Sequence, residues 1–142
     1  MNTINVGRLL LSGFVAGVVL NIGESLLNGV VLAKQIESLN ASKGLPPVSG
    51  GQLGALVGLT FVLGFVIAFA YAAIRPRFGA GVKTAVIAGL ICWFGAYVYA
   101  GLVNAIVGYL PMNLTWLGIL WALFQYSIAA IAGAWVYKEA TV

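Results

Sequence analysis

Residues 6–33 read VGRLLLSGFVAGVVLNIGESLLNGVVLA, an apolar run that a group of polar residues interrupts past its middle. The group is Asn21, Glu24, Ser25 and Asn28, and helical spacing places all four on one face. An acidic side chain near the centre of a membrane helix costs about 2.5 to 3.5 kcal/mol to insert, so it normally faces protein or water. We therefore predict a membrane-spanning helix whose polar face points away from lipid.

The rest of the chain repeats the apolar pattern. Of its 142 residues, 62% are hydrophobic and 7% are charged, a composition far from that of soluble globular proteins. Crossing a ~30 Å hydrocarbon core takes ~20 residues, and the apolar blocks predict helices at about 6–33, 53–74, 84–110 and 114–137. Short connectors make consecutive helices antiparallel. The expected fold class is an all-α membrane protein, an up-down four-helix bundle forming one domain over 1–142 with an outer loop at 34–52.

The basic residues are distributed unevenly between the two sides of the predicted membrane. Five lie at the N-terminal end, in the second connector and at the C-terminal end, whereas Lys34 and Lys43 lie in the first connector. Because positive residues favour the cytoplasmic side, we expect both termini to be cytoplasmic, in a bacterial inner membrane. The second connector carries the densest basic group, which is expected to determine topology and to lie near anionic lipid headgroups: Arg75, Arg77 and Lys83.

Several residue types needed for common chemistry are missing. The chain has no histidine and a single cysteine, Cys92, so the usual ligands of zinc and haem are absent. We find no paired nucleophile and base, and no phosphate-binding glycine motif. We expect no metal site, no catalytic residues and no enzymatic activity. The net charge of +4 reflects membrane topology, so no nucleic-acid partner is expected.

The chain contains 19 glycines, which in membrane helices are expected where two helices touch, because close backbone approach supplies the contact. Gly13 and Gly17 share an arc with the polar group of the first helix. The corresponding packing positions are Gly54 and Gly58 in the second helix and Gly101 in the third.

The third and fourth predicted helices also carry polar residues on their inner faces. At ~1.5 Å per residue, Glu24 lies roughly 7 Å to the outer side of the membrane midplane. One outward-facing cavity is predicted, lined by Asn21, Glu24, Ser25, Asn28, Tyr97, Asn104 and Gln125. Amides at such positions also commonly bond neighbouring helices together without a ligand, whereas a protonatable acid favours a ligand or proton site. No cofactor is required. A non-covalent lipid, quinone or carotenoid would stack on Trp93, Tyr97 and Trp121, which core packing would equally explain.

Two segments resemble parts of a known group of proteins. Residues 71–90 read YAAIRPRFGAGVKTAVIAGL, and residues 132–139 read AGAWVYKE. They are similar to the central connector and closing segment of small, uncharacterised bacterial four-helix membrane proteins. The resemblance implies the same four-helix layout over most of the chain. It carries over no activity and no functional residue.

Two functions from different classes follow from these observations. The first is a non-catalytic membrane protein that acts by lateral helix contact, as an accessory subunit of a membrane complex or as a homo-oligomer. Its partners would be the lipid bilayer, other membrane subunits or itself. The alternative is a small carrier or binding protein that holds an apolar or cationic ligand in the cavity around Glu24. Replacing Glu24 by glutamine distinguishes them, because it removes the acid on which only the second depends.

Overall fold

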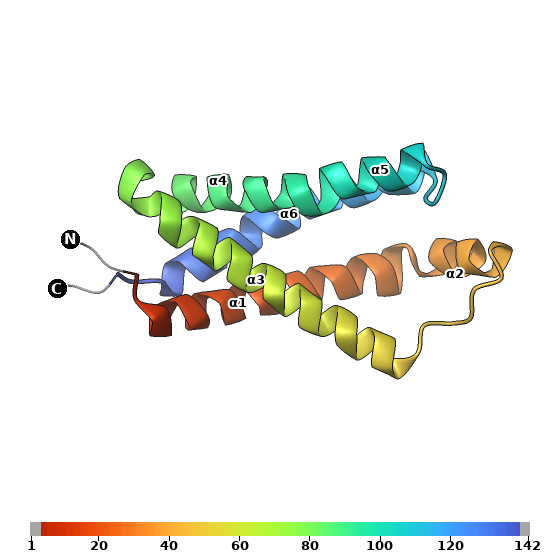
Figure 1. Ribbon diagram of the computed structural model, residues 1–142, viewed down its shortest axis with the longest axis horizontal. Coiled ribbons are helices and arrows are strands. Elements are labelled where there is room, and N and C mark those ends of the chain that lie inside the picture. Colours follow the sequence, from red (N-terminus) through yellow and green to blue (C-terminus); the bar gives the residue numbers. More distant parts are fainter. Residues whose placement is uncertain (1–3, 140–142) are drawn as a thin grey trace.

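The computed structural model describes residues 4–139, in which helices joined by short connectors are the regular secondary structure (Figure 1). Four segments are long and apolar enough to cross a membrane: Val6–Val31, Gly50–Phe78, Val82–Ile106 and Met112–Val136. They pack antiparallel, which confirms the predicted all-α bundle of four candidate membrane spans. The start of α1, the α3–α4 connector and the end of α6 lie together at one end of the bundle. We call this the basic end, and the opposite one the loop end.

The helix bounds differ from those predicted mainly around the first connector. The predicted loop at 34–52 contains a helix, α2, and the second span extends beyond 53–74 at both ends. The elements are α1 (Val6–Leu26), η1 (Leu27–Val31), α2 (Ala33–Ser42), α3 (Gly50–Phe78), α4 (Val82–Trp93), η2 (Phe94–Tyr99), α5 (Ala100–Ile106) and α6 (Met112–Val136).

A capping box explains the early start of α3. The Gln52 backbone N–H donates to Ser49 Oγ at 3.3 Å, and the Ser49 backbone N–H donates to Gln52 Oε1 at 2.8 Å. These reciprocal bonds satisfy donors that a helix N-terminus leaves free. The helix therefore begins inside the glycine-rich stretch that we expected to be loop.

In the four-helix arrangement α3 and α6 touch each other, and the other two spans lie on either side of them. α1 packs against α3 and α6, and α4 packs against the same two helices. α1 and α4 consequently occupy opposite corners of the bundle. The buried core is built from small and aromatic side chains, including Ala16, Leu20, Ile67, Ala88, Ala122 and Tyr126.

Glycines bring α1 and α3 into backbone contact toward the basic end. A Cβ atom added at Gly64 would lie 2.4 Å from the Gly17 nitrogen and 2.5 Å from the Gly13 carbonyl oxygen. Both α1 glycines are also covered by phenylalanines of α3, Phe61 and Phe65. The structure thus places Gly13 and Gly17 at a helix crossing, as expected where lipid provides no hydrophobic drive.

The predicted packing role of Gly54 and Gly58 is wrong within one chain. Nothing lies within 4 Å of a Cβ atom added at either glycine, and residues 50–59 are all exposed. The reason is the path of α3, whose yellow N-terminal half diverges from α1 toward the loop end (Figure 1). Gly101 does have a neighbour, since an added Cβ there would lie 3.3 Å from Thr115 Cγ2.

Candidate functional site

The Glu24 carboxyl group is the centre of a polar cluster that joins three parts of the bundle. Its Oε1 accepts hydrogen bonds from Tyr97 Oη at 2.6 Å and from Gln125 Nε2 at 3.0 Å. Its Oε2 accepts a bond from Asn28 Nδ2 at 2.9 Å. We call these four residues the Glu24 cluster. They come from α1, η1, η2 and α6, so the bonds tie three of the four spans together.

Gly23, next to Glu24, leaves space for the Gln125 side chain of α6. A Cβ atom added at Gly23 would lie 2.4 Å from Gln125 Cδ. Without that atom the amide reaches across α1, where Nε2 also donates to the Leu20 carbonyl oxygen at 3.2 Å. Gln125 is 6% exposed. Gly23 is not among the predicted packing residues, although its position next to Glu24 in the sequence is a signal for one.

Two π-helical turns adjoin the cluster. η1 contains Asn28, and η2 contains Tyr97. A π-turn inserts an extra residue and redirects the side chains around it, and such turns are frequent at functional sites. Each turn supplies one partner of Glu24. Asn28 comes from η1, in the same span as Glu24, and Tyr97 comes from η2, in the third span.

The hydrogen-bond partners of the Glu24 carboxyl group are all neutral side chains. All three partner groups donate to it, and none accepts from it. Within residues 4–139 no arginine or lysine forms an ion pair with Glu24. Glu24 is half-buried and Asn28 is exposed, so the Oε2 side of the carboxylate lies at the edge of the cluster. Chemically, the cluster presents a carboxyl group that is surrounded by hydrogen-bonding side chains inside a candidate membrane span, with no cation of the described residues paired to it.

The other predicted polar residues do not join this cluster. Asn21 Nδ2 donates to the Gly17 carbonyl oxygen at 2.9 Å and to the Val57 carbonyl oxygen of α3 at 3.5 Å. Together with Ser25, Asn21 lines a groove of about 360 Å³ between α1 and α3. Asn104 is exposed and bonds to its own helix through the Ala100 carbonyl oxygen at 2.8 Å. The prediction of one shared cavity is therefore wrong.

Helix geometry explains why the polar stripe of α1 divides. Residues three and four apart are both neighbours on a helix surface, but they lie on opposite sides of the residue from which they are counted, about 60° one way and about 40° the other. Asn21 and Ser25 form one such pair and turn toward α3. Glu24 and Asn28 form the other and turn toward α6 and η2.

An apolar groove lies beside the cluster, between α1 and α6. Its volume is about 360 Å³, and its lining includes Ile22, Gly23, Trp121, Phe124 and Gln125. Of the aromatic residues predicted to stack on a ligand, Trp121 is the one that lines this groove. Trp93 instead donates from Nε1 to the Ile119 carbonyl oxygen at 2.9 Å and is part of the packing.

The described residues contain no group of three or more cysteine and acidic side chains placed to hold a metal ion. The resemblance to small bacterial four-helix membrane proteins stays a prediction. Comparison with family models, with curated proteins and with solved structures found no match.

Proposed function

We propose that this chain is a non-catalytic integral membrane protein that acts by lateral helix contact, through the loop-end half of α3. The observation that carries this proposal is a glycine face without a neighbour. Gly50, Gly54 and Gly58 recur every four residues, and nothing lies within 4 Å of a Cβ atom added at any of them. A glycine in the interior of a helix lowers helix stability by about 1 kcal/mol relative to alanine. Among the described residues, no contact explains why Gly54 and Gly58 are glycine.

The occupant proposed for this face is α3 of a second copy of the chain. Glycines at four-residue spacing allow two membrane helices to cross at short distance, with backbone contact replacing hydrophobic drive. The neighbouring positions are apolar and exposed, including Leu53, Leu56 and Val57. An accessory role in a larger complex would place another protein's helix on the same face.

Native mass spectrometry after mild extraction tests this function. The wild-type chain is expected to retain a second copy. Gly54→Leu and Gly58→Leu should yield monomer, because the added side chains separate the helices. Gly29→Leu is the matched control, since Gly29 also faces open space but lies in η1. A wild-type monomer extracted without any protein partner would refute the proposal, and a different bound protein would favour the accessory role.

A second candidate function is the binding or carriage of a proton or lipophilic cation at Glu24. It is supported by the uncompensated carboxylate and by the π-helical turns around it. A cation or proton would neutralise the charge that the cluster holds inside the span. Binding should then fall as the pH is lowered, because proton and cation compete for one carboxylate.

Tetraphenylphosphonium is a suitable probe for this candidate. Glu24→Gln should abolish its binding and the pH dependence while leaving the oligomeric state unchanged. Glu37→Gln is the matched control, because Glu37 is an exposed acid in α2, outside the four spans. Equal binding by wild type and Glu24→Gln would eliminate this candidate without affecting the proposal for α3.

The proposed location is the bacterial cytoplasmic membrane with the basic end in the cytoplasm. Arg75, Arg77 and Lys83 lie at that end with the start of α1 and the end of α6. The positive-inside tendency supports this orientation. A reporter protein that is active only in the cytoplasm should be active when it is fused to the C-terminus. A reporter that is active only outside the cytoplasm should be inactive at the same position.

A further inference from the structure

A groove at the basic end combines a cation with apolar walls. It lies where the start of α4 meets the end of α6, and its volume is about 280 Å³. Arg75, Tyr71 and Gly81 line it together with Val82, Ala134 and Trp135. This end of the bundle carries an excess of arginine and lysine, so a ligand in the groove would meet a positive field.

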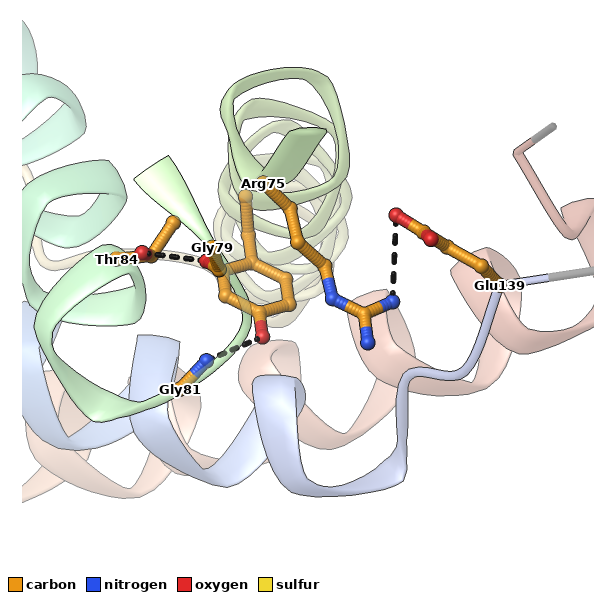
Figure 2. Close-up of polar contacts among 6 residues, drawn as sticks. Arg75, Gly79, Gly81, Thr84 and Glu139 are labelled. Carbon is orange, nitrogen blue, oxygen red and sulfur yellow. Dashed lines mark hydrogen bonds and ion pairs between the residues drawn. The ribbon is translucent and has the colours of Figure 1, made fainter. Parts of the chain in front are cut away.

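Arg75 is held in place from two sides. Its Nη1 lies 3.4 Å from Glu139 Oε1, and its guanidinium lies 5.5 Å above the ring of Tyr137 (Figure 2 shows the ion pair). The same Nη1 is buried and makes no hydrogen bond of normal geometry with the described residues. Burial raises the pKa of the Tyr137 hydroxyl, so the ring beneath the cation is a neutral phenol. The ion pair and the ring thus orient the guanidinium of a residue that lines the groove.

The α3–α4 connector shapes the adjoining wall. Gly79 has φ 83° and Gly81 has φ 135°, conformations that favour glycine. The turn is fastened by Thr84 Oγ1, which donates to the Gly79 carbonyl oxygen at 2.7 Å, and by the Gly81 N–H, which donates to Tyr71 Oη at 3.3 Å (Figure 2). The N-terminus of α4 and Arg75 therefore line the same groove. The N–H groups of a first helical turn add partial positive charge there.

From this geometry we infer that the groove binds the headgroup phosphate of an anionic membrane phospholipid. Arg75 and the start of α4 supply donors and positive charge for the phosphate. Arg77 in the last turn of α3 and Lys83 in the first turn of α4 add charge, so that with Arg75 three cations of this end stand against the carboxylate of Glu139. Val82, Ala134 and Trp135 offer an apolar surface to the glycerol and the first part of an acyl chain. The ends of the spans coincide with the depth of lipid headgroups.

This inference does not depend on the proposed function of α3 or of Glu24. Its test compares lipid retention by native mass spectrometry in detergent, using phosphatidylglycerol, phosphatidylcholine and inorganic phosphate as probes. Wild type should retain phosphatidylglycerol in preference to phosphatidylcholine. Arg75→Gln should weaken that retention on the order of 30-fold, because a charge-assisted hydrogen bond is lost.

Arg77→Gln is the matched control, since Arg77 is an exposed arginine in the same last turn of α3 and lies outside the groove lining. Loss of general surface charge should weaken retention by no more than about fivefold. Ala134→Leu provides a steric arm that leaves every charge in place, and it should also displace the lipid. This arm decides the question if Arg75→Gln fails to fold.

Three results would overturn the inference. Equal weakening by Arg75→Gln and Arg77→Gln would indicate diffuse attraction to the bilayer surface. Unchanged retention in Ala134→Leu would show that the groove is not occupied. Displacement of phosphatidylglycerol by an equal concentration of inorganic phosphate would identify a site for free anions instead of lipid.

Discussion

The basic half of the bundle and the loop half are held together by different means. Toward the basic end, α1 and α3 cross with backbones in contact around Gly13, Gly17 and Gly64. Toward the loop end, α3 leaves the bundle and residues 50–59 are exposed. There the Glu24 cluster connects α1 to α6 and η2. In lipid, which provides no hydrophobic drive between helices, close packing of small residues and interhelical hydrogen bonds are the two available sources of contact.

The largest expected effect comes from blocking the crossing of α1 and α3. Gly64→Ala would place Cβ 2.4 Å from the Gly17 nitrogen, where only backbone movement relieves the clash. We expect the free energy of unfolding in mixed micelles to fall by about 3 kcal/mol. Gly54→Ala on the same helix meets nothing within 4 Å and should raise it by up to ~1 kcal/mol. Equal effects would mean that α3 packs alike in both halves.

The next largest effect tests the hydrogen bonds of the loop half. Tyr97→Phe removes the 2.6 Å bond to Glu24 Oε1 with little change of shape. A loss of about 1 to 2 kcal/mol in unfolding free energy is expected, the upper part of the range for hydrogen bonds between membrane helices. The matched change is Tyr99→Phe, because Tyr99 lies in the same π-helical turn and is 65% exposed. If both variants lost the same amount, the cluster would contribute nothing to stability.

A smaller loss of stability is expected at the α3–α4 connector, in the basic half. Thr84 is buried, and its Oγ1 bonds to the Gly79 carbonyl oxygen at 2.7 Å. Thr84→Val keeps the shape and leaves that carbonyl without this donor, so we expect a loss of about 1 kcal/mol. Thr60→Val is the comparison, since Thr60 Oγ1 bonds only to the Leu56 carbonyl oxygen, which α3 already uses. Denaturation of the two variants side by side measures the difference.

The smallest effect is expected at Asn104. Its side chain is exposed and bonds to its own helix, so Asn104→Ala should change the unfolding free energy by less than ~0.5 kcal/mol. Cation binding measured with the probe for Glu24 should also be unchanged. A strong loss of binding would restore Asn104 to the site and would show that the loop half closes on its ligand.

The polar residues of α1 illustrate how far sequence reasoning reached. The cost of burying an acid indicated that Glu24 meets protein, and Tyr97 and Gln125 were among the residues predicted near it. The division of the stripe between two neighbours was not predictable, because it depends on which helices flank α1 and at what angle. Local pattern carries no information about that angle.

The glycines of α3 show a second limit of prediction from the sequence. Spacing alone predicted that Gly54 and Gly58 pack as Gly13 and Gly17 do. The structure separates them because α3 crosses α1 at an inclination, so that the turns of α3 that precede Gly64 lie away from α1. The early start of α3 was missed for a different reason, since the capping box of Ser49 and Gln52 lies in a stretch that reads as loop.

Composition by itself determined the number of candidate spans, because the length of each follows from the energy of transferring side chains into hydrocarbon. The short connectors determined their antiparallel order, because consecutive helices joined by few residues lie side by side. Tertiary structure decided which side chains meet Glu24, where α3 departs, and how Arg75 is oriented beside a groove. Those features depend on distances between residues far apart in the chain, and such distances arise only when the helices pack.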